Sequence, residues 1–262
     1  LVSYSDDALV CVTIMLLIIL GGLGFLVWDD VRQKGLHWRR YDLQTKLVLV
    51  MTLALILGGA LLFFLIERNR MNADMPLGEQ ILVSFFSAVT PRTAGFNSVD
   101  TAALSDASKL LTVILMFIGG SPGSTAGGIK TVTFLVLVLT IWARARGKST
   151  VCAFKRTIPD EQTQNAMIIA FIVLALAVFG GIFISATSPM GFTDAVYEAV
   201  SALATVGLSA GGTASLSIPA QILIIIYMYF GRVGVLTISL GFLAGNRAEE
   251  RFRYAETNLL IG

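Results

Sequence analysis

Two copies of a short motif at matched spacing constrain this chain more than any other feature of its sequence. Thr93-Ala94-Gly95-Phe96-Asn97 and Thr205-Val206-Gly207-Leu208-Ser209 share the pattern Thr-x-Gly-apolar-small polar. In each copy, a glycine motif inside an apolar run begins 24 residues after the central glycine, at Gly119 and at Gly231. Glycine allows unusual backbone conformations, and backbone carbonyls can replace the water shell of an ion inside a membrane pore. The repeat therefore favours a pore over a soluble core.

A third glycine motif, Gly21-Gly22-Leu23-Gly24, lies in an apolar segment like the other two, but no Thr-x-Gly motif precedes it. The same spacing would place the matching glycine about three residues before Leu1, and the sequence does not begin with methionine. We therefore expect the chain to be a piece of a longer protein that begins just after a filter segment.

The composition indicates an integral membrane protein. Hydrophobic residues make up 55% of the chain and charged residues 14%, whereas an average soluble domain has about 25% charged residues. A helix that spans a bilayer needs roughly 20 apolar residues. Five stretches meet this need, the third with an interruption at Gly119–Gly128 and the fifth with one at Gly231–Gly234: Ala8–Trp28, Leu47–Ile66, Leu110–Ala143, Ala166–Ala186 and Ala220–Ala244. The net charge of +2 is too small to indicate a nucleic-acid partner.

The basic residues predict the orientation of these spans. The connection between the first two spans, the connection between the third and fourth, and the tail together hold 13 of the 19 lysines and arginines. Basic residues that flank membrane spans stay in the cytoplasm, and alternation of sides puts all three stretches there. Acidic residues dominate the opposite face: Asp6, Asp7, Glu67, Asp74, Asp100, Asp106 and Asp194. We expect a multi-pass protein of the cytoplasmic (inner) membrane.

Two connections between spans contain segments of about 12 residues, Gly78–Thr90 and Thr193–Ala204. They are too short to cross a bilayer, so we expect half-helices that enter from the outside. The partial negative charge at their C-terminal ends would favour a cation at the membrane centre. We expect Arg92 to bind an acidic partner behind its loop rather than to face the ion. Glu198 is a partner of the right type, but the sequence does not pair the two.

These motifs resemble those of the Trk/Ktr/HKT superfamily of potassium (and sodium) transporters, and specifically its bacterial Trk/Ktr branch. The resemblance covers the whole chain and rests on Thr90–Asn97, Phe117–Thr131, Ala204–Gly211 and Phe230–Gly234, with support from Ile18–Phe25. In that family, four helix–pore loop–helix repeats surround one pore with pseudo-fourfold symmetry, as in K⁺ channels. The resemblance implies three parts: the last helix of the second repeat (residues 1–30), the third repeat (residues 31–148), and the fourth repeat with a short cytoplasmic tail (residues 149–262).

The resemblance also implies that the Thr-x-Gly segments are strands of a selectivity filter whose carbonyls bind K⁺. The filter residues are then Thr93, Ala94, Gly95 and Phe96 in one strand and Thr205, Val206, Gly207 and Leu208 in the other, with K⁺ at Thr93, Ala94, Thr205 and Val206. Each strand has one filter glycine, whereas tetrameric K⁺ channels have TVGYG. We therefore expect a shorter filter that discriminates less strongly between potassium and sodium.

The Gly-rich segment Gly119–Lys130 looks superficially like a phosphate-binding loop, but Ile129 separates Gly128 from Lys130 and the Walker spacing fails. Glycine and proline at this density must break the third span. In the resembled family this loop is the intramembrane gate, and the alternative is a kink that only shapes packing. The gate residues implied are Gly119, Gly120, Ser121, Gly123, Ser124, Gly127, Gly128, Lys130 and Arg232.

Two basic residues of this set have alternative interpretations. Arg232 lies inside an apolar span, where a charge is costly and usually faces a cavity or a partner. The resemblance makes it a barrier to cations near the gate loop, and stabilisation of a broken helix stays open as the alternative. Lys130 can extend to the cytoplasmic boundary of the membrane, and we favour this over the alternative that it fixes the lower end of the gate loop.

The expected function is uptake of potassium, a monovalent cation, through this filter and gate, with K⁺ as the transported ion and no organic cofactor. The resemblance implies a homodimer in the lipid bilayer, regulated by a cytosolic nucleotide-binding ring, without nucleic acid as a partner. The alternative is a sodium-coupled or sodium-conducting secondary transporter, although the spans hold almost no Asp or Glu for coupling. An enzyme is not expected, because neither a Ser-His-Asp set nor a His/Cys metal cluster can be recognised.

Overall fold

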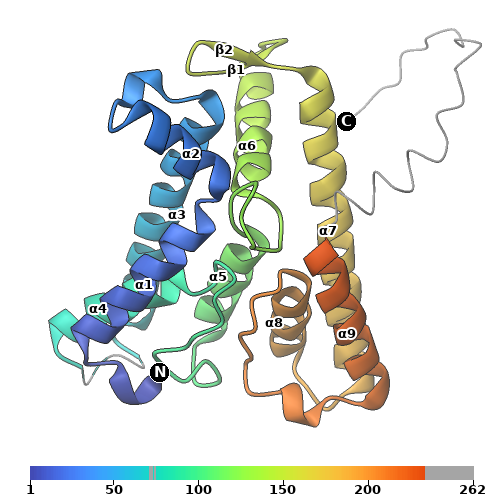
Figure 1. The fold of residues 1–262 in the computed structure, drawn as a ribbon. Helices are drawn as coiled ribbons and strands as arrows, with labels where there is room; N and C mark the ends of the chain where they lie inside the picture. The colour runs from blue at the N-terminus through green and yellow to red at the C-terminus, as the bar shows by residue number, and fades with distance from the viewer. Residues whose placement is uncertain (71–72, 74, 234–262) are drawn as a thin grey trace, which may run out of the picture.

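The computed structural model describes residues 1–70, 73 and 75–233 of the chain. These residues are mostly helical, with one short hairpin near one end of the molecule (Figure 1). The elements in chain order are η1 (Val2–Tyr4), α1 (Ala8–Gly22), α2 (Phe25–Lys34), η2 (Trp38–Arg40), α3 (Leu43–Glu67), α4 (Leu77–Val89), α5 (Asp106–Phe117), α6 (Thr131–Ala145), β1 (Val151–Ala153), β2 (Arg156–Ile158), α7 (Asp160–Thr187), α8 (Phe192–Leu203), η3 (Thr213–Ser215) and α9 (Ile218–Val233).

Two units of the described chain have the same order of elements: a long helix, a short helix, a non-helical segment and a further helix. In the first unit these are α3, α4 and α5, and in the second α7, α8 and α9. Each short helix packs along its long helix (Figure 1). With 13 and 12 residues, α4 and α8 are only about 18–20 Å long and cannot cross a bilayer. The predicted half-helices and the all-helical, repeated fold class are confirmed.

The long helices α3 and α7 are apolar and long enough to span a membrane, with 25 and 28 residues. Large apolar side chains on them remain exposed, including Leu57, Leu61, Phe171 and Phe179. Such exposure is expected where a helix faces lipid rather than water. The bent pair α1 and α2 would make a third span if it is counted as one. The predicted second and fourth spans are therefore confirmed as single helices.

The predicted break in the third span is also confirmed. Helix α5 ends at Phe117 and α6 begins at Thr131. Residues 118–130 between them form a loop that we call the gate loop, after the role that the resemblance implies. The two ends of this loop are paired, because the backbone N–H of Gly119 donates to the carbonyl of Ile129 at 2.9 Å. The loop lies near the middle of the molecule, between the two units (Figure 1).

The prediction of one continuous first span, Ala8–Trp28, is wrong. Helix α1 ends at Gly22 and α2 begins at Phe25, and the two axes meet at 90°. Gly24 at the bend has φ of +83°, a conformation that glycine adopts without steric cost. A Cβ on Gly24 would lie 2.6 Å from the carbonyl oxygen of Pro122 in the gate loop. The bend therefore brings the first helix pair against that loop.

The predicted interruption of the fifth span does not begin at Gly231, because α9 is helical through Gly231 to Val233. Gly234, the other end of that interruption, lies outside the described residues. One glycine costs a helix about 1 kcal/mol relative to alanine, which does not by itself end it. Gly231 instead allows a close approach, since a Cβ there would lie 2.1 Å from the carbonyl oxygen of Leu203.

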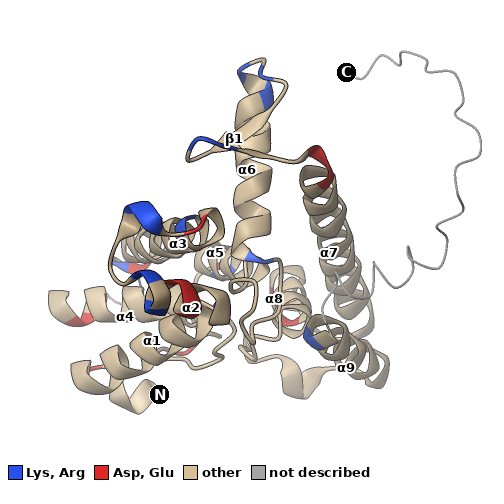
Figure 2. Ribbon diagram, turned by 45° about the horizontal axis from the view of Figure 1, so that its top comes forward, with Lys and Arg blue, Asp and Glu red and all other residues tan. Residues whose placement is uncertain are grey.

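Lysine and arginine gather at one end of the molecule, at the far end of α6, along the hairpin and at the connection between α2 and α3 (Figure 2). This basic end agrees with the predicted cytoplasmic side. The hairpin of β1 and β2 was not predicted, and its strands pair from Val151 with Ile158 to Ala153 with Arg156. The basic residues predicted for the C-terminal tail lie outside the described residues.

Candidate ion pathway

The two Thr-x-Gly segments, here the first filter strand (residues 93–96) and the second filter strand (residues 205–208), follow the C-terminal ends of α4 and α8. Both have positive φ at the same two positions: +63° at Thr93 and +76° at Gly95, then +54° at Thr205 and +87° at Gly207. A positive φ is rare for a β-branched residue and costs roughly 1–2 kcal/mol. Backbone strain of this kind clusters at functional sites. Because the sign of φ alternates along each strand, successive carbonyls can face the same side of that strand.

The two filter strands lie directly against each other. A Cβ on Gly95 would lie 2.4 Å from the carbonyl oxygen of Val206 and 3.4 Å from the Cα of Gly207. A side chain at position 95 would therefore displace the second strand. A Cβ on Gly207 would meet only the Cα of Gly95, at 3.9 Å. There is therefore room for a side chain at position 207 but not at position 95.

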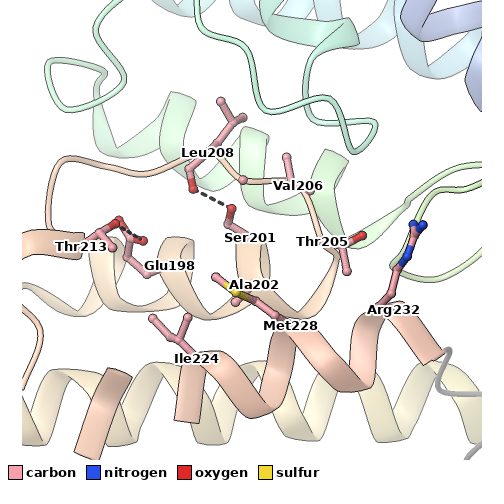
Figure 3. A pocket seen from close by; sticks show the side chains of 11 residues that line it. Glu198, Ser201, Ala202, Thr205, Val206, Leu208, Thr213, Ile224, Met228 and Arg232 are labelled. Carbon is pink, nitrogen blue, oxygen red and sulfur yellow. Dashed lines mark hydrogen bonds between the residues drawn. The ribbon is translucent and has the colours of Figure 1, made fainter. Parts of the chain in front are cut away.

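The carbonyl at the fourth position of each strand is bound by a hydroxyl from the preceding helix end. Thr90 Oγ1 donates to the Phe96 carbonyl, and Ser201 Oγ donates to the Leu208 carbonyl at 2.6 Å (Figure 3). These carbonyls therefore point back toward their own half-helices. Neither hydroxyl was among the predicted site residues, although each half-helix ends in a segment that contains one.

Glu198 on α8 holds the chain that follows the second filter strand. Its buried carboxylate accepts hydrogen bonds from Ser209 Oγ at 2.5 Å, from the Ala210 N–H at 3.0 Å and from Thr213 Oγ1 at 2.9 Å. Figure 3 shows Glu198 and Thr213 joined in this way. Glu198, a partner of the right type for Arg92 that the sequence did not pair with it, instead binds the loop of its own unit.

Arg92 is buried beside the first filter strand, and its hydrogen-bond partner is a hydroxyl rather than an acid: Nη2 donates to Thr52 Oγ1 on α3 at 3.1 Å. The expectation of an acidic partner is therefore not met within the described residues. The Arg92 side chain lines a cavity of about 330 Å³ together with Thr93 and Ala94 on one side and Gly22 of α1 on the other.

The gate loop is fastened at its base and to the first helix pair. Ile129 N–H donates to the Phe117 carbonyl at 3.0 Å, which extends the pairing of the loop ends. Ser121 N–H donates to the carbonyl of Gly22 at 3.1 Å, and the N–H of Phe25 donates to the carbonyl of Gly123 at 3.1 Å. The loop thus bonds to both sides of the bend between α1 and α2.

The far part of the gate loop lies against the second filter strand. A Cβ on Gly127 would lie 2.5 Å from Thr205 Oγ1 and 2.6 Å from the carbonyl oxygen of Ala204. Gly128 next to it has φ of +68°. Only glycine fits at position 127 without a shift, so the sequence allows the loop to approach the strand at this point.

Two basic side chains bind the carbonyls next to Gly127. Arg232 Nη1 donates to the carbonyl of Thr125 at 2.8 Å, and Lys130 Nζ donates to the carbonyl of Ala126. Thr125 and Ala126 were not among the predicted site residues, because a backbone acceptor leaves no mark in the sequence. The contact of Lys130 with the loop differs from the favoured expectation that its side chain only extends to the membrane boundary.

Arg232 lines two cavities. One, of about 430 Å³, lies between α8, the second filter strand and α9, with Arg232 at one end and Glu198 toward the other (Figure 3). The other, of about 670 Å³, is lined by the gate loop from Pro122 to Gly128 and by Lys130. Within residues 1–70, 73 and 75–233, side chains of His, Cys, Asp and Glu do not gather in threes.

A family model described as "TrkH: Cation transport protein" matches residues 1–250 of the chain. The chain belongs to this family. Its relatives include the potassium/sodium uptake protein NtpJ of Enterococcus hirae and the Ktr system potassium uptake protein B of Vibrio alginolyticus, each 37% identical over 100% of this chain. The matches cover 59% and 58% of those two proteins. The chain therefore spans about three fifths of the length of these curated relatives.

The TrkH family comprises cation transport proteins rather than enzymes, which confirms the predicted resemblance and the prediction that the chain is not an enzyme. Among solved structures, the potassium transporter TrkH from Vibrio parahaemolyticus matches with a TM-score of 0.68. The match covers 89% of this chain and 51% of that chain at 20% identity. It therefore shows that the two chains share a membrane fold.

Proposed function

We propose that the full-length protein containing this chain takes up K⁺ across the cytoplasmic membrane through a filter of backbone carbonyls. The observation that carries the proposal is the pair of contacting strands with positive φ at the same Thr and Gly positions. The carbonyls of Thr93, Ala94, Thr205 and Val206 bind the ion in place of water. The names of relatives that take up potassium support K⁺ as the ion.

Within this filter, Phe96 and Leu208 support the strands. Their carbonyls accept hydrogen bonds from Thr90 and Ser201, so they are less available to an ion than those of the three preceding residues. They fix the outer end of each strand to its half-helix. The filter is then three carbonyls deep in each strand, in keeping with a short filter.

The gate loop closes the path on the side of the basic end. The contact of Gly127 with Thr205 places the loop against the second strand, and Arg232 binds the Thr125 carbonyl. An arginine in this position also repels a cation that leaves the filter. Opening would need the loop to move from the strand and this hydrogen bond to break.

The basic end shown in Figure 2 is suited to a cytosolic partner, and we propose a regulatory nucleotide-binding ring there and a homodimer in the bilayer. A second function, conduction or coupled transport of sodium, is favoured by the similarity to the potassium/sodium uptake protein NtpJ. The shallow filter suits it, because few stacked sites leave less discrimination between the two ions.

Growth of potassium-uptake-deficient bacteria on limiting K⁺ tests the proposal. We expect rescue by the full-length gene and failure of its Gly95→Ser variant at equal protein levels. Expression of residues 1–262 alone tests whether these units suffice to form a pore. Rubidium and sodium uptake by the same cells separates the two candidate functions. Equal rescue by Gly95→Ser, with an unchanged rubidium/sodium ratio, would overturn the filter assignment.

A further inference from the structure

An ion pair joins the two units on the side away from the basic end. Lys109 lies in the first turns of α5, the helix that follows the first filter strand, and Asp194 lies in the first turn of α8, the helix that precedes the second strand. Lys109 Nζ is 2.8 Å from Asp194 Oδ1. The side chain of Lys109 is 9% exposed and that of Asp194 is 32% exposed. The pair is thus largely withdrawn from solvent.

A hydrogen bond joins the same two units just beyond the filter strands. Thr101 Oγ1 donates to the carbonyl of Ser209 at 2.5 Å, and Ser209 Oγ in turn donates to Glu198. Glu198 lies one helical turn after Asp194 on α8. The contacts therefore form a closed circuit from α5 through Lys109 and Asp194 to α8, then through Ser209 and Thr101 back to the chain that leads into α5.

The ion pair is the charged link of this circuit. Lysine is almost never buried without a partner, and removal of one member of a buried pair leaves the other charge uncompensated. Asp194 also lies in the first turn of α8, where a negative charge stabilises the helix. The pair therefore fixes where α8 begins relative to α5, and α8 carries the second filter strand at its other end.

We propose that the Lys109–Asp194 pair is a positioning device for the filter, which sets the distance between the two filter strands and so contributes to ion selectivity. This inference rests on the proposed function of those strands. The strands meet in the contact between Gly95 and Val206, and a binding site works only while its groups are held within about 0.5 Å of their productive positions. A shift of α8 against α5 would change that contact directly.

The test compares variants of the full-length protein by rubidium and sodium uptake at measured protein levels. Lys109→Met and Asp194→Asn should each lower the rubidium/sodium uptake ratio on the order of threefold or more, because the supporting contact is lost. The double variant should be no worse than either single one, since both changes remove the same contact. Lys109→Arg keeps the pair and should keep the ratio.

Arg68→Met is the matched control. Arg68 follows α3 on the same side of the molecule, and its guanidinium lies over the Phe64 ring, 5.5 Å from its centroid. Its loss changes the local charge as the loss of Lys109 does, without touching the second unit. An equal fall of the rubidium/sodium uptake ratio in Arg68→Met would overturn the proposal, because the change in local charge alone would then explain the fall.

Two further outcomes separate the inference from the proposed function. If Lys109→Met lowers uptake only in proportion to the amount of folded protein and leaves the ratio unchanged, the pair is merely structural and the inference fails. If the ratio also stays unchanged in Gly207→Ser, the filter assignment itself fails. A changed ratio in Gly207→Ser with an unchanged ratio in Lys109→Met overturns the positioning device alone.

Discussion

The two filter strands have the same backbone conformation but different surroundings. The side chain at the fourth position is 49% exposed in the first strand, at Phe96, and 5% exposed in the second, at Leu208. The second strand also has the gate loop at Gly127 and α9 at Gly231 against its beginning. The motif therefore determines how a strand bends, whereas the neighbouring elements determine how firmly it is held.

The largest expected effect is the difference in uptake between serine substitutions at the two filter glycines. Serine at either position has to adopt a positive φ, at a cost of roughly 1–2 kcal/mol. In Gly95→Ser the new Cβ would in addition lie 2.4 Å from the Val206 carbonyl oxygen, whereas in Gly207→Ser the nearest atom is 3.9 Å away. We expect Gly95→Ser to lose uptake by about tenfold more than Gly207→Ser, since a backbone clash adds more than 1.4 kcal/mol. Initial rates of rubidium uptake per folded protein measure this.

Gly58→Ser provides the control for this prediction. Gly58 lies within α3, and a Cβ there would meet no atom within 4 Å. Its uptake should equal that of the unchanged protein. Equal losses of uptake in the two filter variants would show that the positive φ alone causes the loss. The asymmetric contact between the strands would then have no effect on uptake.

A smaller effect is expected from the polar groups that support each strand. Glu198→Gln removes an acceptor from a carboxylate that receives three hydrogen bonds, and an unsatisfied buried group costs about 1–3 kcal/mol. Arg92→Met removes a single hydrogen bond to Thr52, which is worth about 1 kcal/mol. Thermal unfolding in detergent should therefore show a larger loss for Glu198→Gln.

Glu79→Gln is a suitable control, because Glu79 lies on the other half-helix and accepts one long hydrogen bond, from Ser5 Oγ at 3.3 Å. It should unfold at the temperature of the unchanged protein. A greater loss in Arg92→Met than in Glu198→Gln would reverse the comparison and make the first strand the more firmly supported one.

The sequence predicts those parts of this site that depend on the residue types within one short segment. The half-helices follow from apolar segments too short to span a bilayer, and the filter strands follow from the repeated Thr-x-Gly. The break at Gly119 follows from its neighbours, since Pro122 disrupts a helix and the several nearby glycines weaken it. Residue types in these segments leave the backbone few alternatives, so that no knowledge of the packing is needed.

Other parts depend on tertiary contacts that the sequence does not reveal. Gly119 and Gly231 occupy the same position after their filter strands, yet one follows a helix end and the other lies inside a helix. A glycine can mark the end of a helix, or it can let another element approach the helix closely. At Gly231, only the contact with the Leu203 carbonyl shows that the second case applies. Likewise, the bend at Gly24 depends on the gate loop packed against it, and the partner of Arg92 lies on α3.

The smallest expected effect concerns the two basic residues that bind the gate loop beside the second strand. Arg232→Met removes the hydrogen bond that joins α9 to the Thr125 carbonyl. A net contribution of about 0.5–1 kcal/mol would raise resting uptake about two- to fivefold if the loop closes the path. Lys130→Met removes a contact within the loop itself, with Ala126. Because the paired loop ends keep their backbone hydrogen bonds, we expect less than a twofold rise.

Rubidium uptake without a stimulating partner measures both variants, normalised to folded protein. A larger rise in Lys130→Met would show that the loop's own conformation, rather than its attachment to α9, holds the path closed. A fall in protein level with no rise in Arg232→Met would instead assign that arginine to the stability of α9.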